Sequence, residues 1–129
     1  MLDIKRIHHV AILTGDYETS KQFYTEILGF KILAEVYREQ RDSFKLDLAV
    51  GDRYQIELFS FPDFKPRASY PEAKGLRHLA FEVENVEQSI ADLRAAGVEV
   101  EDARTDCYTG KKYCFFLDPN GQPLELYEL

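Results

Sequence analysis

Apolar and polar residues alternate in six stretches of the chain, and this period of two predicts β-strands. The stretches are residues 31–37, 44–50 and 54–61, followed by residues 98–103, 112–117 and 124–129. Two other segments, residues 17–27 and 86–93, carry their apolar residues at helical spacing. The chain is therefore expected to mix helices and strands.

Both helical segments carry matching boundary signals. Asp16 and Asn85 are good N-cap residues, and Gln88 is placed to complete a capping box with Asn85. Gly29 and Gly97 follow the last apolar position of each stripe, where a left-handed C-cap is common. The two helices should therefore begin and end at corresponding points.

The two halves of the chain repeat each other. The sequence HVAI at residues 9–12 matches HLAF at residues 78–81, and QIELF at residues 55–59 matches PLELY at residues 123–127. Each half has a short strand, a helix and three further strands in the same order. The pattern therefore predicts two βαβββ repeats.

These repeats predict an α+β fold. Repeat one covers about residues 4–61, a proline-containing linker covers residues 62–75, and repeat two covers about residues 76–129. One βαβββ unit cannot cover both faces of its sheet, so the two should form a curled mixed sheet with the helices outside. We expect residues 1–129 to form a single domain.

The composition excludes several kinds of partner. The chain has 129 residues and a formal net charge of -7, which disfavours binding to nucleic acid. No apolar run approaches the roughly 20 residues that span a membrane, and the polar N-terminus is not that of a signal peptide. Cys107 and Cys114 fit neither a metal knuckle nor a disulfide framework, so reduced thiols in the cytoplasm are expected.

The repeated strands place polar side chains on one face. His9 and His78 each share a face with an alanine two residues later, whereas His8 falls on the helix-packing face and is expected to be structural. Glu57 and Glu125 stand inside apolar strands, where an unpaired carboxylate is costly. Because the four occupy repeat-equivalent positions, His9, Glu57, His78 and Glu125 are predicted to hold one cation.

The chemistry of this set favours a divalent transition metal. Two carboxylates neutralise such an ion, and two imidazoles favour Ni, Zn, Co, Mn or Fe over Ca or Mg. Four protein ligands leave two positions open in octahedral coordination, where substrate oxygens can bind. The sequence therefore predicts a catalytic rather than a structural metal site.

Four segments carry a family likeness. They are residues 7–12 (IHHVAI), 23–30 (FYTEILGF), 75–81 (GLRHLAF) and 116–126 (FLDPNGQPLEL). These segments resemble the glyoxalase/bleomycin resistance/dioxygenase superfamily, whose members are also called vicinal oxygen chelate proteins. The ligand order His, Glu, His, Glu is similar to that of bacterial glyoxalase I.

The resemblance implies a metal-dependent lyase similar to lactoylglutathione lyase, which stabilises an enediolate of a small-molecule substrate. Glu57 or Glu125 would be the base. Leu13 and Phe61 stand where bacterial glyoxalase I has an arginine that contacts glutathione and an asparagine, so the resemblance leaves open whether glutathione is used. The expected pocket combines apolar walls with basic residues: Leu13, Phe59, Phe61 and Tyr127, with Arg41 and Lys112 or their neighbours Arg38 and Lys111.

Other functions of the superfamily remain open. An epimerase uses similar enolate chemistry but usually has Gln at the position of Glu57, and fosfomycin thiol transferases and extradiol dioxygenases typically use two His and one carboxylate. A different class is the bleomycin-resistance type, which sequesters a drug without a metal. The resemblance also implies a homodimer.

Overall fold

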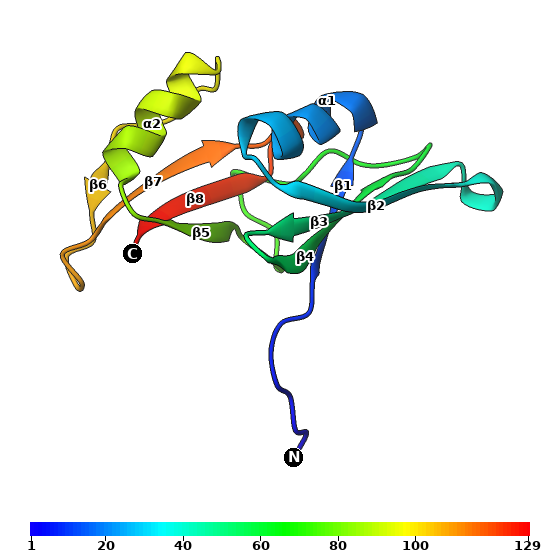
Figure 1. Ribbon diagram of the computed structural model, residues 1–129, viewed down its shortest axis with the longest axis horizontal. Helices are drawn as coiled ribbons and strands as arrows, with labels where there is room; N and C mark the ends of the chain where they lie inside the picture. The colour runs from blue at the N-terminus through cyan, green and yellow to red at the C-terminus, as the bar shows by residue number, and fades with distance from the viewer. The chain divides into compact units, whose positions relative to one another are not determined.

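The computed structural model describes residues 1–129 and contains two compact units, Met1–Lys65 and Pro66–Leu129. Each unit has one four-stranded mixed sheet and one main helix (Figure 1). The predicted α+β class with two βαβββ units is therefore confirmed. The boundary between the units falls inside the predicted linker.

The first unit has the strand order β1-β4-β3-β2. Its elements are β1 (Val10–Thr14), α1 (Tyr17–Gln22), a π-helical turn (Phe23–Ile27), β2 (Lys31–Arg38), a 3-10 turn (Glu39–Arg41), β3 (Ser43–Val50) and β4 (Arg53–Ser60). Strands β1 and β4 are parallel, and the other pairs are antiparallel. The chain thus returns beside its own first strand.

Helix α1 lies along one face of this sheet (Figure 1). The predicted cap is present, because Asp16 Oδ1 accepts a hydrogen bond from the Thr19 amide at 3.2 Å. Gly29 has a φ of 77°, which ends the helical segment as predicted. The alternation along the strands buries one side of the sheet, and its core residues are Ile12, Leu46, Leu48, Ile56 and Leu58.

The second unit repeats this architecture with the strand order β5-β8-β7-β6. Its elements are β5 (Leu79–Val83), α2 (Val86–Ala95), β6 (Arg104–Thr105), β7 (Lys112–Leu117) and β8 (Pro123–Glu128). Asn85 Oδ1 accepts from the Gln88 amide at 2.9 Å, but the Gln88 side chain donates to Asp92 at 3.0 Å instead of completing the capping box. The buried core consists of Val86, Ile90, Leu93, Cys114, Phe116, Leu124 and Leu126.

The prediction of a regular strand at residues 98–103 is wrong. Only Val100 forms an isolated bridge, to Phe116, and the regular strand is the short β6. The reason is that a side chain takes the place of a backbone partner in the hydrogen-bond ladder. Glu101 Oε1 accepts a hydrogen bond from the Phe115 amide at 2.8 Å. No helix in the chain has the length and apolar character that crossing a bilayer requires.

Glu35 links β2 to α1. Lys21 Nζ donates to Glu35 Oε2 at 2.8 Å, and the Tyr17 hydroxyl donates to the same oxygen. The hydrogen bond from Lys21, with a smaller one from Tyr17, lowers the pKa of Glu35 below its ordinary value. Because the folded pKa is below the unfolded one, this carboxylate stabilises the fold above the ordinary carboxyl pKa and ceases to do so as pH falls through the lowered value.

We expect Glu35→Gln to reduce stability at neutral pH by less than about 1 kcal/mol, because the cluster is partly exposed. The difference from wild type should shrink as the pH falls into the acid range, since the wild-type carboxylate is then protonated as well. Urea denaturation at pH 7 and pH 3 measures this. Glu39→Gln, at an exposed turn, is the control, and a difference that is independent of pH would contradict the assignment.

Candidate metal centre

His9 and Glu57 meet in the first unit because β1 and β4 run parallel. Ala11 lies opposite Glu57 in the ladder, and His9 immediately precedes β1. His9 Nε2 contacts Glu57 Oε2. The Glu57 side chain is only 8% exposed, whereas that of His9 is 39% exposed. A buried carboxylate therefore faces an accessible imidazole.

His78 and Glu125 form the corresponding pair in the second unit. Ala80 lies opposite Glu125 in the parallel ladder of β5 and β8. His78 Nε2 is 2.9 Å from Glu125 Oε2, and His78 Nδ1 is buried without a hydrogen-bond partner. The imidazole packs edge-on against Phe115, with ring centroids 4.9 Å apart.

The donor atoms of the second pair have the spacing of two ligands of one metal ion. Nitrogen and oxygen ligands lie roughly 2.0–2.2 Å from a transition metal, so adjacent ligands in an octahedron are about 3 Å apart. The separation of 2.9 Å between His78 Nε2 and Glu125 Oε2 matches that spacing. Three or more potential ligands do not converge within either unit. Each unit therefore supplies half of the predicted four-ligand set.

The two carboxylates differ in their surroundings. Asp47 lies opposite Glu57 in the β3–β4 ladder, and Lys45 Nζ bridges the two acids, at 2.7 Å from Asp47 Oδ1 and 3.1 Å from Glu57 Oε1. At the equivalent position, Phe115 lies opposite Glu125. Glu57 therefore has both oxygens engaged, whereas Glu125 has one oxygen without a charged partner.

Tyr54 joins the first pair through a β-bulge that the alternation does not reveal. Simple alternation would put Gln55 on the face of Glu57, but the β3–β4 register skips Gln55 and pairs Tyr54 with Ala49. The Tyr54 ring lies 5.9 Å from that of His9. Burial raises the pKa of Tyr54 to about 12, and a hydrogen bond to Glu57 adds to the shift. The phenol thus remains a proton donor at neutral pH.

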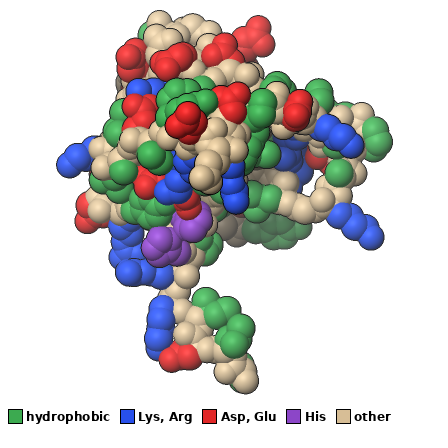
Figure 2. Space-filling model, turned by 90° about the vertical axis from the view of Figure 1, so that its right-hand side faces the viewer, with side chains coloured by type: hydrophobic (Ala, Val, Ile, Leu, Met, Phe, Trp, Pro, Cys, Tyr) green, Lys and Arg blue, Asp and Glu red, His purple; other side chains and the backbone are tan.

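His8 does not occupy the helix-packing face that the pattern predicted. It is exposed just before β1, with its Nδ1 2.8 Å from His9 Nδ1 and its ring 5.3 Å from that of Tyr54. The reason is that regular strand geometry begins only at Val10, so the alternation does not extend back to His8. Histidine side chains are visible at the surface where the extended N-terminal segment leaves the first unit (Figure 2).

Three predicted pocket residues share the face of Glu57 in the first unit. Leu13 is 56% exposed and lies opposite Phe59 in the ladder, and Phe59 stacks on Phe61 with centroids 6.0 Å apart. In the second unit, Tyr127 lies two residues beyond Glu125 on its face, and its hydroxyl donates to Asp106 Oδ2 at 2.8 Å. Each pair therefore has aromatic neighbours on its own sheet.

The two predicted basic pocket residues lie elsewhere. Arg41 is exposed in the 3-10 turn at the tip of the β2–β3 hairpin. Lys112 Nζ is 2.9 Å from Glu87 Oε1 in α2, so it points to the helix-covered side of its sheet. Sequence reasoning gave Lys45 and Asp47 no role in the site, because only the strand register brings them beside Glu57.

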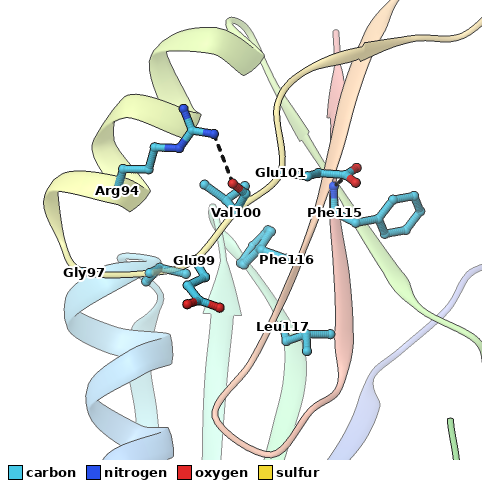
Figure 3. Close-up of a pocket in the computed structure, with 9 residues that line it drawn as sticks. Arg94, Gly97, Glu99, Val100, Glu101, Phe115, Phe116 and Leu117 are labelled. Carbon is cyan, nitrogen blue, oxygen red and sulfur yellow. Dashed lines mark hydrogen bonds between the residues drawn. The ribbon is translucent and has the colours of Figure 1, made fainter. Parts of the chain in front are cut away.

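A groove of about 880 Å³ lies in the second unit, along the segment that connects α2 to β6 (Figure 3). Arg94 donates there to the Val100 carbonyl at 3.1 Å, and the Phe115 ring points away from Leu117 and the rest of the groove. The groove contains none of the predicted metal ligands. Its size alone therefore does not mark it as the reaction site.

Comparisons with known proteins agree with the repeated architecture. Residues 6–126 match the family described as Glyoxalase/Bleomycin resistance protein/Dioxygenase superfamily. The chain is 55% identical to the protein YaeR of Escherichia coli (strain K12), over 99% of both chains. It is 54% identical to the protein YwkD of Bacillus subtilis (strain 168), covering 97% of this chain and 98% of that one. Neither name carries an activity.

A solved structure of a glyoxalase family protein from Enterococcus faecalis has a TM-score of 0.90 and 51% sequence identity, covering 98% of this chain and all of that one. More distant relatives have names that specify chemistry. They include probable lactoylglutathione lyases, epimerases and, by fold alone, a fosfomycin resistance protein. The names of these relatives cover several reactions and do not select one for this chain.

Proposed function

Because the chain belongs to the Glyoxalase/Bleomycin resistance protein/Dioxygenase superfamily, we propose that it is a divalent-metal-dependent lyase or isomerase of glyoxalase type. Its substrate is a small molecule with two adjacent oxygens. The observation that carries the proposal is the contact between a solvent-accessible histidine and a glutamate that is nearly buried, which each unit builds at the same position of its parallel ladder.

The two pairs together suit one first-row transition metal. Glu57 and Glu125 balance the charge of the ion, and His9 and His78 favour Ni, Zn, Co, Mn or Fe. Since neither pair is a site by itself, the proposal requires both units to contribute to one ion. The two units belong either to one chain or to two chains of a homodimer.

A bound cation would supply a Lewis acid for the substrate oxygens. The remaining work falls to the side chains. Glu57 is held by His9 and Lys45, whereas the ion pair of Glu125 with His78 uses one carboxylate oxygen and leaves the other without a charged partner. We therefore assign proton transfer at the substrate carbon to Glu125. The Tyr54 hydroxyl donates to Asp47 Oδ1 at 3.3 Å, beside Glu57.

A second reading is a binding protein of bleomycin-resistance type. The specific observation in its favour is that each imidazole contacts its carboxylate directly, so each glutamate has a partner without an ion. The stacked rings of Phe59 and Phe61 also suit a flat ligand. The metal content of the purified protein distinguishes the two readings.

The first test is metal binding. Wild-type protein loaded with Ni or Zn is expected to hold about one ion for each complete quartet. His78→Ala and Glu57→Gln should weaken the metal affinity by more than about 100-fold. Loss of a group that only hydrogen-bonds to a metal ligand already weakens metal affinity about 10- to 100-fold, and these variants lose a ligand itself. Elemental analysis after dialysis measures this, with the exposed Glu84→Gln as the control. Wild-type protein that cannot be loaded with Ni, Zn, Co or Mn would exclude the proposal.

The second test concerns the base. With methylglyoxal plus a thiol as substrate, Glu125→Gln is expected to lower kcat by about 10²- to 10⁴-fold, the usual contribution of a general base. Metal content is measured on the same samples, so that loss of the ion is separated from loss of the base. Glu84→Gln should retain wild-type kcat. If Glu125→Gln has an unchanged kcat at full metal occupancy, Glu125 is not the general base.

The third test decides which units share an ion. One variant carries His9→Ala with Glu57→Gln, and the other carries His78→Ala with Glu125→Gln. If the site forms between two chains, the co-expressed mixed dimer regains one complete quartet, and metal binding and activity return to about half of wild type. If the site forms within one chain, no mixture regains either. Recovery is compared with each variant expressed alone.

A further inference from the structure

Arg38, the last residue of β2, carries a guanidinium group that has no acidic partner. Its Cζ lies 4.8 Å from the centroid of the Phe59 ring and 5.7 Å from that of Phe61. Its one hydrogen bond is from Nη2 to Ser43 Oγ, at 2.9 Å. Its Nε is buried and bonded to nothing. A buried donor left unsatisfied is costly, so this arrangement needs an explanation.

The guanidinium stands on the same sheet face as the first His–Glu pair. Phe59 and Phe61 lie two and four residues beyond Glu57, so their side chains share its face and follow it at about 7 Å and about 14 Å. Arg38 pairs with Ser43 in the β2–β3 ladder, on that same face. A molecule with one end at Glu57 can therefore reach Arg38 along the stacked rings.

The second unit contains an arginine in the same setting but with its charge already neutralised. Arg104 lies over Tyr113 and Phe115, at 5.0 Å and 5.4 Å from their centroids. Unlike Arg38, it donates from Nε to Glu101 Oε1 at 3.0 Å. The stacked arginine of the second unit is thus paired with a carboxylate. No side chain of the first unit supplies a carboxylate to Arg38, whose one hydrogen bond is to Ser43.

We propose that Arg38 binds a carboxylate group of the substrate. The guanidinium lies over the two aromatic rings, and its N–H donors that Ser43 does not take remain for a planar oxyanion, in a fork geometry that lysine cannot imitate. Lys45 shares the face but is already paired with Asp47 and Glu57. Arg38 is therefore the cation without an acidic partner beside the stacked rings of Phe59 and Phe61.

This inference rests on the proposed function for the other end of the substrate. It specifies a molecule with adjacent oxygens at one end and a carboxylate about 7–14 Å away. Methylglyoxal alone has no carboxylate, whereas its hemithioacetal with a carboxylate-bearing thiol has both groups. The thiol would then be selected by its charge, at a position different from the glutathione contacts that Leu13 and Phe61 replace.

The first experiment uses metal-free protein and benzoate, so that it does not depend on activity. Titration is followed by the NMR signal of the Arg38 Nε–H, assigned by its loss in Arg38→Met. We expect saturable shifts of this signal with benzoate and none with benzyl alcohol, which has the same ring without the charge. Affinity for benzoate should fall at least tenfold in Arg38→Met, stay reduced in Arg38→Lys, and be unchanged in Arg104→Met.

Arg38→Met keeps an apolar stem over the two rings, and its circular dichroism and urea midpoint confirm that it is folded. Equal binding of benzoate and benzyl alcohol, or equal binding by wild type and Arg38→Met, would reduce the contact to a structural cation–π pair and overturn the proposal. If the protein binds benzoate through Arg38 but cannot be loaded with metal, the carboxylate subsite is supported and the proposed metal-dependent activity is excluded.

The second experiment uses metal-loaded protein and two hemithioacetals of methylglyoxal, formed with 3-mercaptopropionate and with 2-mercaptoethanol. Arg38→Met is expected to raise KM at least tenfold for the charged adduct, with kcat unchanged, and to leave the uncharged adduct unaffected. If Arg38→Met loses activity with both adducts, or keeps full activity with both, Arg38 does not bind the substrate carboxylate.

Discussion

The structure depends on one feature that both units share: the last strand returns parallel to the first. In each unit this pairing sets an alanine opposite a glutamate, so that the histidine two residues before the alanine faces the carboxylate. Helix and hairpin connections make the return possible, and the apolar residues on the other side of the sheet hold it against the helix. The proposed chemistry begins from this register.

Burial makes the pairs costly and therefore informative. Glu57 and Glu125 are 6% and 9% exposed, and an isolated ionised carboxylate at such a position would strongly destabilise the fold. The repeat gives both the same imidazole partner but different neighbours across the sheet, Asp47 with Lys45 in one unit and Phe115 in the other. The two units thus build the same His–Glu pair, while the neighbours across the sheet engage both oxygens of Glu57 and leave one oxygen of Glu125 without a charged partner.

The same divergence separates the two arginines. Both lie over a pair of aromatic rings at the outer strand of their sheet, but Glu101 neutralises Arg104 and nothing in the first unit neutralises Arg38. The first unit consequently combines a buried acid, an aromatic surface and an unpaired cation on one face. That combination suits the binding of an elongated anionic molecule. The groove beside α2 is marked only by its size and contains none of the predicted metal ligands.

The sequence by itself determined the two βαβββ units, the caps at Asp16 and Asn85 and the identity of the two His–Glu pairs. These follow from local periodicity, capping chemistry and internal repetition, all of which are written along the chain. It could not reveal the bulge at Gln55 that brings Tyr54 to Glu57, the replacement of a regular strand by the Glu101 side chain, or the direction of Lys112 toward α2. Only the tertiary structure decided these, because they depend on which strands pair, in what register, and which charged side chains then lie across from one another.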